Sequence, residues 1–301
     1  MDLLVLILVA LSALLALIGT GVLFTRWRRN RYRFDIRTLL ILFALLGGGI
    51  FTLQRFIVPI CAHRWAIHTV YESGADVVFR DDAFEASEGL YNDPRIDNAW
   101  REVRLLQCST DGQTATVASQ LKNLSEAKGL ILFGGVTDKG LKAICENGMN
   151  SSLGEIVLFE TPVTATGLAE LAKLNQLQML TFRSCPIKGA DLTGLTSVAT
   201  LRNLILQERG SSANPNRIDK LGFRAIGQMQ NLENLGLDNL SISDEAAGEL
   251  KNLKQLKMLS LFNCQISYAA INNLRQALPQ CKLVVAKDDD APVFEPALEG
   301  R

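Results

Sequence analysis

Apolar residues recur along most of this chain in one repeated arrangement. Residues 177–187 read LQMLTFRSCPI and residues 256–266 read LKMLSLFNCQI, so both follow Leu-x-x-Leu-x-(Leu/Phe)-x-x-Cys-x-Ile. The alternation of apolar and polar positions in this half of the unit predicts a half-buried strand. Units of this kind, separated by 24, 24, 31 and 24 residues, begin at Leu153, Leu177, Leu201, Leu232 and Leu256.

The second half of each unit has apolar residues at helical spacing, as in Leu168, Leu171 and Leu174. A strand followed by a helix with one apolar face cannot bury its own core, so neighbouring units must stack into a solenoid. Looser units at 101–107, 129–137 and 280–285 extend the pattern. We therefore expect an α/β solenoid over residues 100–286, with about seven repeats of about 24 residues, parallel strands on its concave face and helices on its convex face.

The repeated cysteine occupies one slot of the unit. Cys185 and Cys264 share this slot with Thr161 and Leu240 in neighbouring units. The two cysteines are three coils apart, about 15 Å at the spacing of paired strands, which is too far for a disulfide. We interpret both as buried structural thiols and not as nucleophiles.

Two apolar runs precede the repeats, the first without any charged residue and the second with Arg55 near its end. Residues 3–24 are long enough to cross a bilayer as a helix, and residues 38–58 form a second, shorter candidate that contains three consecutive glycines. A cleaved signal peptide is the alternative for the first run, but no positive segment precedes it. The segment at 25–37 between the runs contains six arginines, which favours a cytoplasmic loop. The sequence thus predicts a transmembrane hairpin over residues 1–60, in the inner membrane of a bacterium, with the repeats facing the periplasm or outside.

Residues 61–99 connect the hairpin to the repeats. A short juxtamembrane helix is expected at 62–73, a strand at 75–81 after Gly74, and a polar acidic linker at 81–99. His63 and His68 are five residues apart, which does not match two metal ligands on one helical face. The acidic tail at 287–301 is predicted to be disordered.

Charge and motifs narrow the function. Residues 1–64 carry eight basic and two acidic residues, a net charge of +6, whereas the remainder carries 23 basic and 29 acidic residues, a net charge of −6. The repeat region therefore lacks the basic excess expected of a nucleic-acid-binding protein. The sequence contains no GxSxG, HExxH, Walker or GxGxxG motif, so we expect no catalysis, no metal and no cofactor.

From residue 100 to 285 the chain resembles leucine-rich repeat proteins with short cysteine-containing, ribonuclease-inhibitor-like repeats. The stretches RYRFDIRTLLILFALL and AHRWAIHTVYESGADVVFRDD resemble the membrane-anchoring head of leucine-rich repeat proteins common in planctomycete bacteria, although the extra first span departs from that pattern. This resemblance implies interaction with a protein and no fixed chemistry.

The favoured hypothesis is a membrane-tethered module that binds a protein or another envelope ligand on its concave face. The alternatives are a self-assembling envelope scaffold and a substrate receptor of a ubiquitin ligase, which would need an F-box-like head. The patch expected to bind is Phe133, Val157, Phe159 and Met179. The full set of concave-face candidates is Ile131, Phe133, Glu155, Val157, Phe159, Met179, Thr181, Arg183, Asn203, Ile205, Gln207, Asn234, Gly236, Asp238, Met258, Ser260 and Phe262.

The unit that begins at Leu201 is seven residues longer than its neighbours. The excess lies within 207–217, where glycine, serine, asparagine and proline predict a loop that bulges from the rim of the concave face. Both a binding role and a functionless insertion are compatible with this position.

Overall fold

The computed structural model describes residues 55, 58–79, 103–149, 151–208 and 218–286. The first predicted span, the linker at 81–99 and the tail lie outside these residues, as do nearly all of the second span and most of the 207–217 insertion. Within the described residues, no helix is both long and apolar enough to cross a membrane. The chain divides into two units, of which the second, residues 66–97 and 101–301, contains all the strands described here.

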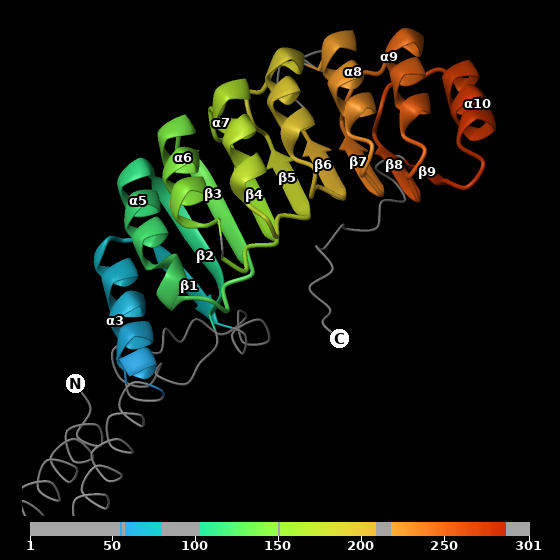
Figure 1. Cartoon of the computed structure of the whole chain (residues 1–301). Helices are drawn as coiled ribbons and strands as arrows, with labels where there is room; N and C mark the ends of the chain where they lie inside the picture. The colour runs from blue at the N-terminus through green and yellow to red at the C-terminus, as the bar shows by residue number, and fades with distance from the viewer. Residues whose placement is uncertain (1–54, 56–57, 80–102, 150, 209–217, 287–301) are drawn as a thin grey trace, which may run out of the picture. The chain divides into compact units, whose positions relative to one another are not determined.

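One sheet of nine strands runs through the second unit in sequence order from β1 to β9 (Figure 1). β1 is antiparallel to β2, and every later pair is parallel, so eight strands form the stack for which about seven repeats were predicted. The strands are β1 (Asp76–Phe79), β2 (Val103–Thr110), β3 (Gly129–Gly135), β4 (Glu155–Phe159), β5 (Met179–Arg183), β6 (Asn203–Gln207), β7 (Asn234–Asp238), β8 (Met258–Phe262) and β9 (Lys282–Ala286).

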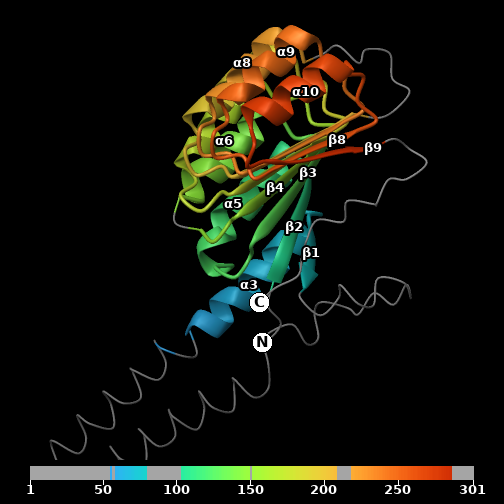
Figure 2. The ribbon, with the colours of Figure 1, turned by 90° about the vertical axis from the view of Figure 1, so that its right-hand side faces the viewer.

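Helices follow the strands and cover one face of the sheet, while the other face carries none of the described helices (Figure 2). The α-helices are α3 (Val58–Glu72), α5 (Asp111–Gln120), α6 (Asp138–Asn147), α7 (Ala165–Glu170), α8 (Lys220–Gln228), α9 (Asp244–Glu249) and α10 (Tyr268–Ala277). The 3-10 helices are η3 (Leu121–Asn123), η4 (Leu171–Lys173), η5 (Gly189–Ser197) and η6 (Leu250–Asn252).

The predicted apolar slots form the core between sheet and helices. All five leucines that begin the units are buried, and so are the helical-half residues Leu168, Leu171 and Leu174. Within the strands, a side-chain period of two sends the second and fourth residues, such as Ile156 and Leu158, into the same core and their neighbours to the opposite face. The solenoid prediction is therefore confirmed for residues 103–286, apart from the insertion.

Three details differ from the sequence-based expectation. Val285, which the repeat pattern of the unit at 280–285 places in an inward slot, is 42% exposed because no described strand packs beyond β9. Ala277 is only half-buried, and the next residue, Leu278, fills the core instead. The helix expected after Ile187 is the 3-10 helix η5, in which a side chain at Gly194 would collide with the Ala165 carbonyl oxygen at 2.2 Å.

The start of the sheet is closed by the segment that was expected to connect it to the membrane. The helix predicted at 62–73 is α3, and the strand predicted at 75–81 is the shorter β1. Gly74 joins them with a φ of 80°, a conformation that glycine adopts without strain. Its carbonyl oxygen accepts a hydrogen bond of 2.8 Å from Gln113 Nε2, which ties this turn to α5.

Successive coils are joined by a carboxylate ladder at the start of the helices. The Asp111 carboxylate accepts hydrogen bonds from the backbone N–H of Thr137 (2.8 Å), the Thr137 hydroxyl (2.7 Å) and the Gly140 N–H (3.0 Å). One coil later, the Asp138 carboxylate accepts hydrogen bonds in the same way from the backbone N–H and the hydroxyl of Thr164. Partial burial opposes ionisation of Asp111, but the hydrogen bonds from Thr137 and Gly140 outweigh it and lower the pKa of its carboxyl group. The ladder thus holds the coils, and with them the strands, in register.

Candidate functional site

The open face of the sheet presents three straight rows of side chains. The register between β3 and β9 has no shift, so the first, third and fifth residues of each strand lie beside their equivalents in the next. Most of these residues are half-buried, whereas the second and fourth belong to the core. The rows therefore coincide with the predicted concave-face candidates.

The predicted apolar patch is brought together over β3 to β5. The rings of Phe133 and Phe159 are 5.7 Å apart between centroids and tilted by 51°. Val157 and Met179 lie on the same face and are half-buried. Aromatic and aliphatic side chains that are half-exposed on one face can bury further apolar surface against a partner.

A hollow lies next to this patch, over β4 to β8. The empty space in it, which is open to solvent, measures about 550 Å³. Gly236 contributes no side chain to the middle row, which leaves room beside Ile205. The lining residues are Glu155, Val157, Thr181, Arg183, Ile205, Gln207, Gly236, Leu237, Asp238 and Phe262.

Nine of the seventeen concave-face candidates line this hollow. The remaining eight lie on the same face outside it: Ile131, Phe133, Phe159, Met179, Asn203, Asn234, Met258 and Ser260. Thr181 and Ser260 are less accessible than expected, at 5% and 3% exposure, because both lie in the crowded middle row of the sheet. Leu237 borders the hollow without having been predicted. Its side chain points to the core, so the alternation of the strand gives no sign of this role.

Arg183 is the charged residue with the most unusual surroundings in the hollow. Its Nε atom is buried and has no hydrogen-bond acceptor among the described residues. Its Cα partners in the neighbouring strands are Phe159 and Gln207. Burying a charged donor without an acceptor is costly, because the water lost on burial is not replaced.

Gln207 and Glu155 are polar groups of the hollow that interact with their neighbours. Gln207 Nε2 donates a hydrogen bond of 2.9 Å to Asp238 Oδ2. Burial raises the pKa of the Glu155 carboxyl group, and the positive charges of Arg104 and Arg183 only partly offset this effect. The hollow thus combines apolar walls with one arginine and two carboxylates, those of Glu155 and Asp238.

The cysteines have the surroundings of structural residues. Cys185 is buried, donates to the carbonyl oxygen of Leu158 at 3.2 Å and contacts the Thr161 hydroxyl at 3.4 Å. Burial raises the pKa of the Cys185 thiol, and it raises that of Cys264 to about 11. Cys264 is only half-buried, which differs from the fully buried slot that we expected. Both thiols stay protonated near neutral pH, and a protonated thiol is a poor nucleophile.

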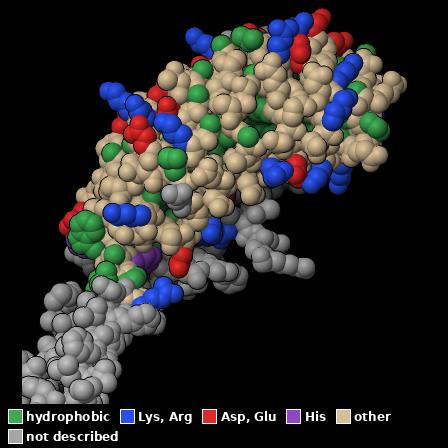
Figure 3. All heavy atoms as spheres, viewed as in Figure 1, with side chains coloured by type: hydrophobic (Ala, Val, Ile, Leu, Met, Phe, Trp, Pro, Cys, Tyr) green, Lys and Arg blue, Asp and Glu red, His purple; other side chains and the backbone are tan. Residues whose placement is uncertain are grey.

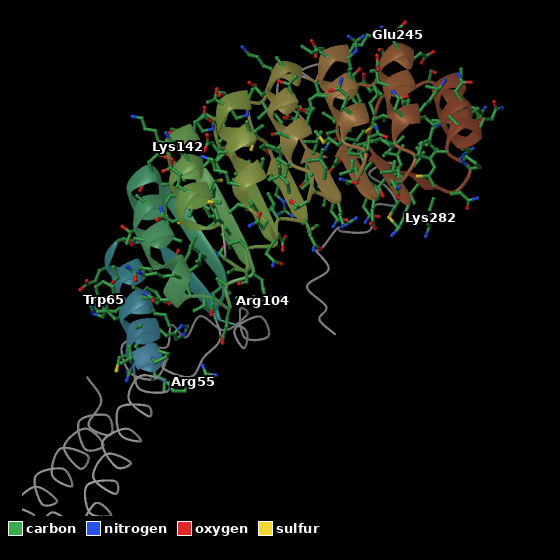
Figure 4. All side chains as sticks on the ribbon, in the orientation of Figure 1. Arg55, Trp65, Arg104, Lys142, Glu245 and Lys282 are labelled. Carbon is green, nitrogen blue, oxygen red and sulfur yellow. The ribbon has the colours of Figure 1, made fainter. Side chains whose placement is uncertain are left out.

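Charges elsewhere on the solenoid are mixed. On the face seen in Figure 3, acidic and basic side chains are interspersed and form no continuous basic surface. Figure 4 shows Lys142 and Glu245 on the helical side of the solenoid, and Arg104 and Lys282 towards its strand side. Among the described residues, no three histidine, cysteine, aspartate or glutamate side chains are grouped so that they could hold a metal ion.

Comparisons with known proteins find similarity of fold and no significant similarity of sequence. No protein-family model matches the sequence, and no curated protein matches it significantly. Solved structures with a similar fold include a leucine-rich repeat protein of Leptospira interrogans, at 17% identity over 57% of this chain and 56% of that one, with a TM-score of 0.33. An internalin of Listeria monocytogenes is 19% identical over 59% of this chain and 51% of that one, with a TM-score of 0.33.

A third similar structure is a complex of TLR13 with ssRNA13, at 15% identity over 62% of this chain and a TM-score of 0.39. This chain spans only 30% of that protein and little more than half of the other two. The fold is a leucine-rich repeat solenoid. The strand-and-helix coils, their buried leucines and the parallel register establish it independently of these similarities.

Proposed function

We propose that this chain is a membrane-tethered recognition module that binds a protein ligand on the open face of its solenoid. The observation that carries the proposal is the hollow over β4 to β8. It combines half-exposed apolar side chains with Arg183, whose buried Nε has no described acceptor. Such a combination is typical of binding sites, in which apolar walls supply affinity and a few polar groups supply specificity.

A photo-crosslinking residue tests this proposal in the full chain in its native membrane. Placed at Val157 or Ile205, on the open face, it should yield discrete adducts identifiable by mass spectrometry. Lys142 and Glu245, on the helical side, are the matched control positions (Figure 4). Equal adducts from both sets would refute binding through the open face. An adduct between two copies of this chain would replace ligand recognition with self-assembly.

The tether is the second part of the proposal and is supported by the sequence alone. Two apolar runs at 3–24 and 38–58 flank a loop with six arginines, which favours a hairpin with the loop in the cytoplasm and the solenoid outside. Single cysteines introduced as Asn30→Cys and Ser212→Cys, in a chain whose native cysteines are replaced, should be labelled from opposite sides of the membrane. Labelling of both from the same side, or a mature N-terminus near residue 25, would refute the hairpin.

A further inference from the structure

We propose that the hollow selects an extended peptide segment with a single acidic side chain, whose carboxylate is held by Arg183. This inference rests on the proposed function, because it names the class of ligand that the open face would bind.

Arg183 needs an acceptor that the described residues do not provide. Its guanidinium forms none of the ion pairs found among them, and the buried Nε accounts for one of its five donor positions. Glu155 influences it only through charge, from the first position of the adjacent strand. A carboxylate matches the planar fork of an arginine with two parallel hydrogen bonds, so a ligand carboxylate would satisfy Nε as well as a terminal nitrogen.

Gln207 supplies a second polar contact beside it. Gln207 is the Cα partner of Arg183 on β6, about 5 Å away at the usual spacing of paired strands. Because its amide nitrogen donates to Asp238, its carbonyl oxygen remains the atom that can accept from a ligand N–H. A donor and an acceptor at this spacing suit a peptide, which offers a side-chain carboxylate and a nearby backbone N–H.

The shape of the hollow favours an extended chain. It extends over five strands, about 19 Å from β4 to β8, which corresponds to about six residues of extended peptide. Val157, Ile205 and Phe262 provide apolar walls along it. A Cβ atom added at Gly236 would meet Ile205 only at 3.5 Å, an ordinary contact, so an apolar ligand side chain finds room above this glycine.

Two carboxylates limit the charge of the ligand. Glu155 on β4 and Asp238 on β7 line the hollow together with Arg183 on β5. Their repulsion disfavours polyanions such as nucleic acid or polyphosphate, whereas one carboxylate on an otherwise neutral peptide meets one arginine. The hollow is therefore selective for an acidic side chain and against a dense anion.

A library of random seven-residue peptides, probed with the full-length protein in detergent micelles, tests this inference. Bound peptides should be enriched in aspartate or glutamate with apolar neighbours. Arg183→Met should weaken the best peptide by about tenfold or more, while the matched control Arg275→Gln, on the exposed side of α10, should not. An asparagine or glutamine version of that peptide should bind less well to the native protein and should lose nothing further on Arg183→Met.

Ile205→Arg, which fills the hollow, separates the possible failures. Peptide binding that is abolished by Ile205→Arg but unchanged by Arg183→Met would refute the acidic ligand and leave the proposed function standing. Peptide binding that survives both substitutions would refute binding through the open face as well. A library that yields no bound peptide would also refute the present inference. Matching thermal unfolding of the variants and the native protein shows that each result reflects binding and not misfolding.

Discussion

The ladder at Asp111 makes a graded prediction about stability. Asp111→Ala removes the acceptor of three hydrogen bonds and leaves the N–H groups of Thr137 and Gly140 without a partner. Bonds to a charged acceptor contribute about 1.5–3 kcal/mol each, but partial exposure lets water replace some of them. We expect Asp111→Ala to lower the free energy of unfolding by about 2–4 kcal/mol.

Asp111→Asn should cost less, for a geometric reason. Both backbone N–H groups donate to the same oxygen, Oδ1, which asparagine retains. The substitution removes only the negative charge and the second carboxylate oxygen, to which the Thr137 hydroxyl donates. The amide nitrogen of asparagine takes the place of this oxygen, and the hydroxyl can rotate to accept a hydrogen bond from it. The expected loss is about 1 kcal/mol at pH 7.

The sign of the pH dependence follows from the lowered pKa of the Asp111 carboxyl group. A group whose pKa is lower in the folded state stabilises the protein above its unfolded pKa, about 3.9, and this contribution is lost as the pH falls through the folded value. The stability difference between native protein and Asp111→Asn should therefore be constant from pH 7 to 5 and shrink below about pH 4.

Urea unfolding of the full chain, followed by far-ultraviolet circular dichroism at several pH values, measures all three quantities. Asp138→Ala is the matched comparison. Among the described residues, the Asp138 carboxylate accepts hydrogen bonds from Thr164 alone, so its loss should cost less than the loss of the Asp111 carboxylate. Equal losses for Asp111→Ala and Asp111→Asn, or a difference that grows as the pH falls, would refute the idea that the ladder is held by an ionised carboxylate.

Three further changes test other parts of the solenoid. Cys185→Ser should destabilise the fold by about 1–2 kcal/mol, because the smaller hydroxyl leaves a gap in a buried slot that the sulfur fills. The native thiol should resist alkylation under conditions that label the exposed Cys61, and rapid labelling of Cys185 would contradict its assignment. Glu160→Gly should stabilise the folded protein by about 1 kcal/mol, because Glu160 has a φ of 55° and only glycine adopts that conformation without strain. A loss of stability in thermal unfolding would show that the contacts of the Glu160 side chain outweigh this strain. Deleting residues 209–215 should restore the 24-residue period and leave the melting temperature unchanged or higher, whereas unfolding would show that this segment packs as core.

The sequence predicts the parts of this molecule that depend on local alternation. Ile156 and the other even positions of β4 to β8 are buried, and Val157, Ile205 and the other odd strand positions lie on the open face, because a strand side chain has only two directions. The left-handed backbone at Glu160 and Ser184 was not predicted, since neither is a residue that favours it. This conformation occurs at the residue that directly follows a strand, where its backbone N–H donates to the last carbonyl oxygen of the next strand. Glu160, after β4, donates in this way to the Arg183 carbonyl oxygen at the end of β5.

Contacts between coils account for the rest. Asp111 and Thr137 are 26 residues apart and meet only once the coils are stacked. The lack of an acceptor at Arg183 depends on what the neighbouring strands place beside it, which no pattern within a single repeat contains. The sequence thus located the face that carries the candidate site, and the structure identified the hollow within it.

The antiparallel strand β1 makes the two ends of the sheet unequal. A coil inserted anywhere between β2 and β9 would find parallel neighbours on both sides, with the evenly spaced hydrogen bonds that its own strand requires. A coil placed ahead of β1 with its strand in the direction of β2 would have to pair antiparallel with β1, so the parallel register that joins the other coils would be interrupted there. Lengthening of the array, whether by gene duplication or by design, therefore preserves this register within the array or beyond β9, but not at the side of β1.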